Sequence, residues 1–206
     1  MAIRFVIEGD LRFISHHDTM RLFERALSRA QLPVKFSQGF NPRPRLSLPI
    51  PRAVGIASGV ELLVVDLAEP AEPGVVLDRL SEQMPAGLKL TDAWMIADKH
   101  PPQPVRVDYE LPLPPDRVET VSQATQNLMA APTWAIERTG PGARKIKDID
   151  LKQYLAEASV CEGILRWTVH VTAGGTLRPG ELLAAVGLPP QEWQHHVRRT
   201  GVQWAS

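Results

Sequence analysis

The chain has 206 residues, enough for one large domain or two small ones, and its 44% apolar and 22% charged residues are typical of a globular protein. The formal net charge is +0, so a cluster of one sign is balanced elsewhere in the chain. The single cysteine, Cys161, excludes an intramolecular disulfide and any metal or iron–sulfur cluster built from this chain's cysteines alone. We expect its thiol to be inert and partly buried.

Nothing near the start of the chain resembles a signal peptide, because charges interrupt the first fifteen residues at Arg4, Glu8, Asp10 and Arg12. No run approaches the ~18 apolar residues that a membrane-spanning helix needs. We therefore expect a cytoplasmic protein with no membrane partner.

The first predicted elements are a strand and a helix. Residues Ile3–Ile7 are apolar and β-branched and predict a strand that continues past a turn at Gly9. Ser15, with Asp18 three residues later, resembles a capping box and predicts the start of a helix. Apolar residues then recur at helical spacing until Pro33, which indicates one buried helix face.

The rest of the first half completes a β-α-β-β-α-β order, which is the order of a ferredoxin-like domain. The predicted elements are short strands at Val34–Phe36 and Arg45–Leu48, a buried strand at Gly59–Leu67, a helix at Pro73–Met84 and a strand at Leu88–Ala97.

The proline-rich segment 99–104 is typical of a linker and divides a domain at 1–98 from a second at 105–206. The second domain has predicted strands at Val105–Leu113, Trp134–Arg138 and Ile164–Thr172, and predicted helices at Asp116–Met129, Asp150–Ala158 and Pro179–Val186. We predict an α+β protein with two tandem ferredoxin-like (split βαβ) halves, the second less regular.

Positive charge gathers between Arg12 and Arg52, where eight basic residues face two acidic ones. Such a patch on a neutral chain indicates an anionic partner, with nucleic acid as the first candidate. Three of the arginines, Arg21, Arg25 and Arg29, recur every four residues and predict an exposed helix stripe. The alternative is a stripe that only solubilises the helix.

The loop at 37–45 combines glycine, proline, asparagine, phenylalanine and arginine. Its prolines restrict the backbone, so the loop is suited to stack a base on Phe40 and clamp phosphates with arginine. The alternative is an ordered turn whose Phe40 fills the core. In this half of the chain, the residues that we assign to RNA or anion binding are Arg21, Arg25, Arg29, Ser37, Gly39, Phe40, Asn41, Arg43 and Arg45.

Two histidines, His16 and His17, follow the predicted helix cap. An imidazole there is suited to general acid–base chemistry, and the helix N-terminus favours its neutral form. Consecutive helical residues point about 100° apart, so the two rings are not expected to hold one ion, and we assign no metal site. The alternative is that one ring packs and the other is solvated.

A second basic cluster, Arg144, Lys145 and Lys147, lies in a predicted loop and is a further candidate for RNA or anion binding. Flexible basic loops are also commonly only solvated. Asp148 and Asp150 follow as a carboxylate pair to which we assign no partner. Phosphate-binding, dinucleotide-binding and metalloprotease motifs are missing from the sequence.

The segment Ser15–Ser47 resembles the radical-SAM-linked family of uncharacterised domains, which occur as separate proteins or fused behind a cobalamin-binding radical SAM protein. The matching positions are Ser15, His16, Asp18, Arg21, Arg25, Ala26, Arg29, Ala30, Leu32, Pro33, Ser37, Gly39, Phe40, Asn41, Pro42, Pro44 and Ser47. Further matches lie at Gly55, Ser58 and Glu61, at Lys147, Asp150, Leu151 and Tyr154, from Leu177 to Leu183, and at the end near Trp204.

The resemblance implies a radical SAM partner that carries an iron–sulfur cluster, S-adenosylmethionine and cobalamin, whereas we expect no cofactor in this chain. It also implies the overall plan of tandem ferredoxin-like RNA proteins. The family usually has leucine where this chain has His17, so His16 is the stronger candidate for a role.

We therefore expect an accessory module that binds tRNA or rRNA for modification or processing by that enzyme and is not an enzyme on its own. The first alternative is a metal-independent RNA-processing enzyme that uses His16 as general acid or base. The second is a protein–protein scaffold for the radical SAM partner.

Overall fold

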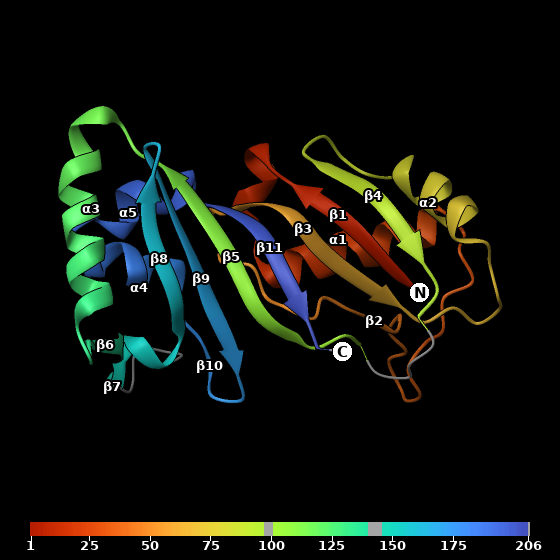
Figure 1. Ribbon diagram of the computed structural model, residues 1–206. Helices are drawn as coiled ribbons and strands as arrows, with labels where there is room; N and C mark the ends of the chain where they lie inside the picture. Colours follow the sequence, from red (N-terminus) through yellow and green to blue (C-terminus); the bar gives the residue numbers. More distant parts are fainter. Residues whose placement is uncertain (97–100, 140–145, 206) are drawn as a thin grey trace. The chain divides into compact units, whose positions relative to one another are not determined.

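The computed structural model describes residues 1–96, 101–139 and 146–205. They form two compact units, unit 1 at Met1–Gln103 with Ala205 and unit 2 at Pro104–Trp204. Each unit combines an antiparallel sheet with helices (Figure 1). The predicted α+β class is confirmed. In the described ranges, no helix is both long and apolar enough to cross a bilayer.

The sheet of unit 1 has the strand order β4-β1-β3-β2, and every neighbouring pair is antiparallel. Its strands are β1 Ala2–Ile7, β2 Leu46–Ser47, β3 Ala57–Val65 and β4 Leu88–Trp94. The two central strands are largely apolar, which suits strands with a neighbour on each side. The edge strand β2 is only two residues long, because the chain before it forms a hairpin loop.

Two helices, α1 His16–Arg29 and α2 Pro73–Ser81, pack on the sheet of unit 1 (Figure 1). The ring of Phe23 on α1 meets that of Phe5 on β1 edge to face, with 5.0 Å between centroids. The core that the helices and sheet share includes Ile3, Phe5, Ile7, Phe23, Leu27, Leu63, Val65, Val76, Leu80, Leu88 and Leu90. The sheet face that carries this core is apolar except at Ser58 and Glu61 of β3, which pair with Ile7 and Phe5 and are buried.

The predicted continuation of the first strand beyond Gly9 is wrong. A 3₁₀ helix, η1 Gly9–Phe13, follows β1 instead. Gly9 has a φ of +58°, a left-handed conformation that turns the chain out of the strand. The turn brings Ser15 to the position from which it caps α1.

The sheet of unit 2 has the order β11-β5-β9-β8, and its neighbouring strands are again antiparallel. A two-residue strand pairs with the end of β9 beyond β8. The strands are β5 Pro104–Pro112, β8 Leu155–Cys161, β9 Ile164–Thr172, β10 Gly175–Thr176 and β11 Arg198–Trp204.

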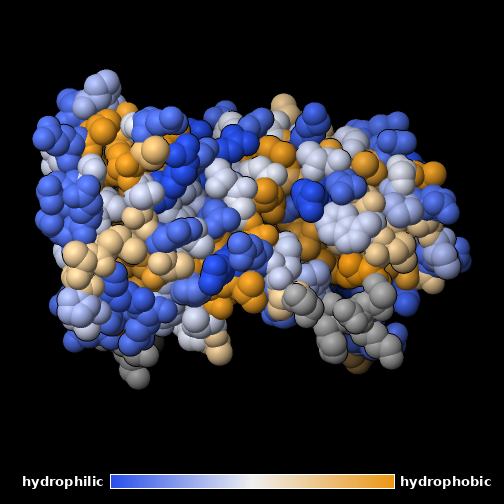
Figure 2. All heavy atoms as spheres, viewed as in Figure 1, coloured by the Kyte–Doolittle hydropathy of each residue, from blue (hydrophilic) through white to orange (hydrophobic). Residues whose placement is uncertain are grey.

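The long helix of unit 2, α3 Pro115–Ala130, packs against β8 and β9, and its outer surface is hydrophilic (Figure 2). Two short helices, α4 Pro179–Ala185 and α5 Pro190–Trp193, precede β11. A separate hairpin pairs β6 Ala135–Thr139 with β7 Ile146–Asp150.

The predicted helix at Asp150–Ala158 is wrong. A single 3₁₀ turn, η3 Leu151–Gln153, leads directly into β8. Glu162 and Gly163 both have positive φ, of 53° and 74°, which is the backbone of the tight turns that join adjacent antiparallel strands. This turn pairs β8 with β9, and it leaves the thiol of Cys161 exposed rather than partly buried.

Candidate nucleic-acid interface

The start of α1 is organised by the predicted cap. The backbone amide of Asp18 donates to Ser15 Oγ at 3.1 Å, and the Ser15 hydroxyl donates to the Asp18 carboxylate at 2.7 Å. The hydrogen bond from Ser15 lowers the pKa of Asp18 below its usual value. The cap thereby sets His16 as the first helical residue.

His16 is half-buried at this helix start, whereas His17 is exposed. Burial is the main cause that lowers the pKa of His16 below 6.5; His17 and Arg52 lower it further, while Glu61 opposes them. The centroids of the two imidazole rings are 5.9 Å apart, and the ring planes are inclined by 71° to each other. Among the described residues, no group of three or more histidine, cysteine or acidic side chains is placed to hold a metal ion.

Arg52 is only 8% exposed, and its guanidinium contacts the backbone just before this helix start. Its nitrogens donate to the backbone oxygens of Arg12 at 2.6 Å, Ile56 at 2.7 Å and Ile14 at 3.2 Å. Arg52 therefore ties η1 and the turn that leads into α1 to the segment before β3. From the sequence, we identified Arg52 only as one of the basic residues between Arg12 and Arg52, without a structural role.

Glu61 is a buried carboxylate on β3, with 4% of its surface exposed. It pairs with Phe5 across the strands, so both side chains point to the sheet face that α1 covers. We call His16, Arg52 and Glu61 the helix-start cluster. The sequence offered two signals for Glu61: it is one of two charges in the otherwise apolar run Gly59–Leu67, and it matches the pattern of the radical-SAM-linked domains.

Residues 37–43 form a closed hairpin loop, which we call the 37–43 loop. Phe36 pairs with Pro44 across its base. The Ser37 amide donates to Arg43 O at 2.8 Å, and the Arg43 amide donates to Ser37 Oγ at 3.0 Å. Gly39 has a φ of +136°, a conformation that other residues rarely adopt. These bonds hold the loop in one shape at its base.

Phe40 at the tip of this loop is fully exposed, and Phe36 at its base is 54% exposed. The alternative in which Phe40 fills the core is therefore wrong. Asn41 and Arg43 are exposed beside it. The loop presents an aromatic ring together with a guanidinium and an amide, which are groups that stack on bases and bind phosphates.

The arginine stripe is exposed as predicted, but its members have different surroundings. Arg21 lies 4.0 Å from Asp18, and Arg29 donates to the side chain and backbone oxygen of Gln83 at 3.2 and 2.9 Å. Arg25 and Arg29 line one pocket, whereas Arg45 lines another. The structure does not gather the stripe, Arg43 and Arg45 in one groove.

In the second basic cluster, Arg144 and Lys145 lie outside the described residues. Lys147 falls in β7, where it pairs with Arg138. Asp150 has a structural part, since its Oδ1 accepts from the amides of Trp134 at 2.9 Å and Lys152 at 3.0 Å. Lys147, which we predicted in a loop, is therefore a residue of the β6–β7 hairpin.

Residues 1–179 match a family described as an uncharacterized protein conserved in bacteria (DUF2344). The chain belongs to this family. The match includes the helix-start cluster, the 37–43 loop and most of unit 2. No curated protein shows significant similarity to the chain. The family description states no activity, so a function has to be argued from the side chains of this member.

Proposed function

We propose that this protein is an accessory RNA-binding module that presents tRNA or rRNA to a radical SAM enzyme in the cytoplasm. The enzyme is a separate polypeptide that holds the iron–sulfur cluster, S-adenosylmethionine and cobalamin, and this chain holds none of them. The partner is supported by the resemblance of Ser15–Ser47 to radical-SAM-linked domains. RNA binding is supported by the geometry of the 37–43 loop.

The observation that carries RNA binding is the full exposure of Phe40 on a loop whose base is closed by hydrogen bonds. Exposure of a phenyl ring to water is unfavourable for the isolated protein. A partner that covers the ring removes this apolar area from water, which favours binding. Stacking on a base suits a ring held at a loop tip, and Arg43 at the loop end supplies a donor for phosphate.

The fold proposed for both units is ferredoxin-like, a plan that RNA-binding domains with four-stranded sheets also use. In support, the strand orders β4-β1-β3-β2 and β11-β5-β9-β8 have the same connectivity, with one helix after the first strand and helical structure before the last. The β6–β7 hairpin inserted after α3 explains why the second half is less regular in sequence.

The test is RNA binding by the wild-type protein and by Phe40→Ala, with Phe13→Ala as the matched control. Phe13 is also an exposed phenylalanine, but it lies in η1 outside the loop. Loss of one base–aromatic stack should weaken binding about tenfold in Phe40→Ala. The control should bind as the wild type does. Equal affinities in the two variants would contradict the proposal.

The electrostatic part of the proposal has its own readout. Affinity should fall when potassium chloride is raised from about 50 to about 200 mM, because bound phosphates release counterions. Arg43→Gln should weaken binding and flatten that dependence, whereas the exposed Arg117→Gln in unit 2 should not. A salt-independent affinity would overturn the electrostatic part.

His16 favours a second candidate function, a metal-independent RNA-processing enzyme. Its lowered pKa leaves the imidazole neutral near pH 7, which is the state that a general base requires. Incubation of RNA with wild-type protein and His16→Ala separates the two functions. Turnover that disappears in the variant, with binding retained, supports an enzyme, and absence of turnover in the wild type supports the binding module.

A further inference from the structure

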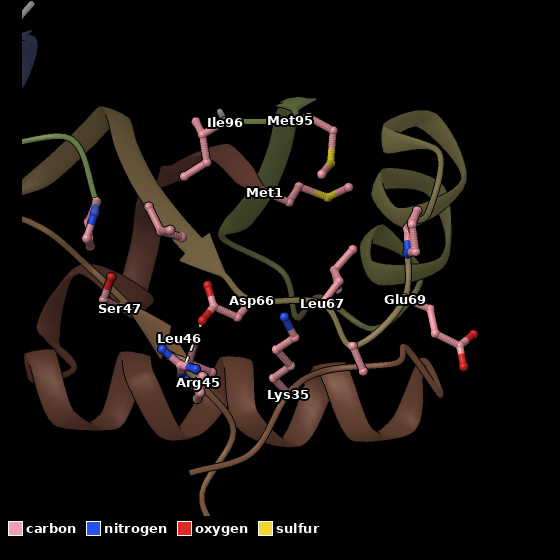
Figure 3. A pocket seen from close by; sticks show the side chains of 14 residues that line it. Met1, Lys35, Arg45, Leu46, Ser47, Asp66, Leu67, Glu69, Met95 and Ile96 are labelled. Atoms are coloured by element: carbon pink, nitrogen blue, oxygen red, sulfur yellow. Dashed lines mark ion pairs between the residues drawn. The ribbon is translucent and has the colours of Figure 1, made fainter. Parts of the chain in front are cut away.

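A cavity of about 840 Å³ opens in unit 1 beside the base of the 37–43 loop (Figure 3). Its walls come from the start of β1, the end of β3, the segment after β4 and both strands of the loop's hairpin. The side chains that matter for its chemistry are Met1, Lys35, Arg45, Ser47, Asp66 and Met95. The proposed function makes no use of this cavity.

The cavity and the loop are built on the same hairpin. The Arg45 amide donates to Lys35 O at 2.7 Å, the Lys35 amide to Asp66 O at 2.8 Å, and the Asp66 amide to Arg45 O at 2.9 Å. These bonds fix the two basic residues at the cavity wall. Phe40 is five positions after Lys35, so an extended chain places their Cα atoms at most about 17 Å apart. A strand of a few nucleotides covers that distance.

The charges at the cavity are not fully matched. Arg45 Nε lies 3.2 Å from Asp66 Oδ2, and this ion pair leaves little net charge. Lys35 has no ion-pair partner within the described ranges, and its ammonium is directed toward the space between Asp66 and Leu67 (Figure 3). The carboxylate of Glu69 points away from that space (Figure 3). The cavity therefore offers a cation to an anionic group.

Lys35 supplies the donor for that group. A lysine ammonium has three N–H donors and a full positive charge, which suits a phosphate group. Ser47 also lies at the cavity wall, on β2, but the Asp66 carboxylate stands between its hydroxyl and the Lys35 ammonium (Figure 3).

The opposite part of the wall is apolar. Met1 and Met95 bring their thioethers to the same side of the cavity, close to Leu67 (Figure 3). Met95 is 55% exposed, so its thioether is accessible to a ligand. Thioethers are polarisable and make favourable contacts with aromatic rings. The wall thus suits a planar ring whose attached phosphate extends toward Lys35.

We propose that this cavity is a nucleotide subsite that holds one nucleotide of the bound RNA, next to the segment that stacks on Phe40. The phosphate binds the Lys35 ammonium, and the base lies against Met1 and Met95. The Arg45–Asp66 pair closes the polar side and offers both donor and acceptor to the base edge. This inference rests on the proposed RNA binding and names where a second nucleotide is held.

The test is NMR of protein with ¹³C-labelled methionine methyl groups, titrated with AMP and separately with adenosine. Both ligands should shift the Met1 and Met95 signals and leave Met129, on α3 of unit 2, unchanged. AMP should bind about tenfold more tightly than adenosine, because one charge-assisted hydrogen bond is worth about that factor. Lys35→Gln should remove this difference, whereas Lys89→Gln, an exposed lysine on β4, should keep it.

The outcomes separate the subsite from the proposed function. Met1 and Met95 signals that do not respond to AMP at millimolar concentration overturn the subsite, and so does an AMP preference that survives Lys35→Gln. Neither result affects RNA binding at the loop, which Phe40→Ala tests.

Discussion

The helix-start cluster and the 37–43 loop each contain one arginine of the basic segment, but they use their side chains in opposite ways. At the helix start, Arg52 and Glu61 are buried, and the Arg52 guanidinium is occupied by backbone oxygens. At the loop, Phe40 is fully exposed, and Arg43 is exposed beside it. One region therefore stabilises the fold, and the other exposes the groups that we propose bind RNA.

The difference shows that a count of positive charge overstates the binding surface. Arg29 and Arg52 donate to backbone oxygens, and Arg45 is paired with Asp66. Fewer basic side chains of this segment are therefore available for phosphate contact. They include Arg43 in the loop and Lys35 beside its base. Substitutions at buried and exposed members should consequently change different quantities, stability in one case and RNA affinity in the other.

The largest expected effect compares two phenylalanines. Phe23→Ala should lower the free energy of unfolding by about 3–5 kcal/mol, because its buried ring packs on Phe5 and leaves a cavity. Phe40→Ala should change it by less than about 0.5 kcal/mol, as for other exposed positions. Urea denaturation measures both. A large loss of stability in Phe40→Ala would contradict this distinction between the two rings, since Phe40 would then have a structural role.

The next effect concerns arginine. Arg52→Met should destabilise the protein by about 3 kcal/mol, because the backbone oxygens of Ile14 and Ile56 each lose a donor and that of Arg12 keeps only the Gly55 amide. Arg25→Met is the matched control on the exposed stripe and should stay within about 0.5 kcal/mol. The same denaturation experiment distinguishes them. Equal stabilities would mean that Arg52 does not hold the helix start together.

A smaller effect tests the cap. Ser15→Ala should cost about 1 kcal/mol, because the Asp18 amide loses its acceptor at the first turn of α1. Ser28→Ala, at an exposed position of the same helix, should be neutral or slightly stabilising, since alanine is the better helix former. Thermal unfolding of the two variants is sufficient. Unchanged stability in Ser15→Ala would show that the Ser15 cap does not stabilise α1.

The smallest effect is the pH dependence of His16. Its pKa is lower in the folded protein than the ordinary 6.5, so the unfolded chain binds the proton more readily. The contribution of neutral His16 to the free energy of unfolding should therefore be complete above pH 6.5. It should decline as the pH falls from 6.5 toward the lowered pKa of His16. His16→Gln should decline less over this window when unfolding is measured at several pH values. Identical pH profiles would contradict the burial of the imidazole.

Where a segment has a strong local pattern, the sequence predicts the structure well. The strict alternation of Ile164–Thr172 predicts β9 with the bounds that the structure has. The cap at Ser15 is also local, and its hydrogen bond is present. In contrast, β8 is composed of residues that also suit a helix, and its pairing depends on the turn at Glu162 and Gly163. Long-range pairing overrides local preference there.

The candidate site shows the same division. Exposed arginines on α1 follow from helical spacing, and closure of the 37–43 loop follows from its glycine and prolines. The burial of Arg52 cannot be predicted from the sequence. Residue type and spacing are the same whether an arginine in a basic segment faces water or backbone oxygens. The orientation of Phe40 likewise had two alternatives in the sequence, and only the three-dimensional structure distinguishes them.

The most direct test of RNA binding at the 37–43 loop is ultraviolet cross-linking of bound RNA to the full chain, followed by mass spectrometry of the peptides. We expect the principal cross-link within residues 37–45, at or next to Phe40, and its loss in Phe40→Ala. Cross-links confined to other peptides, with none in this segment, would contradict the claim that the loop is where this protein holds RNA.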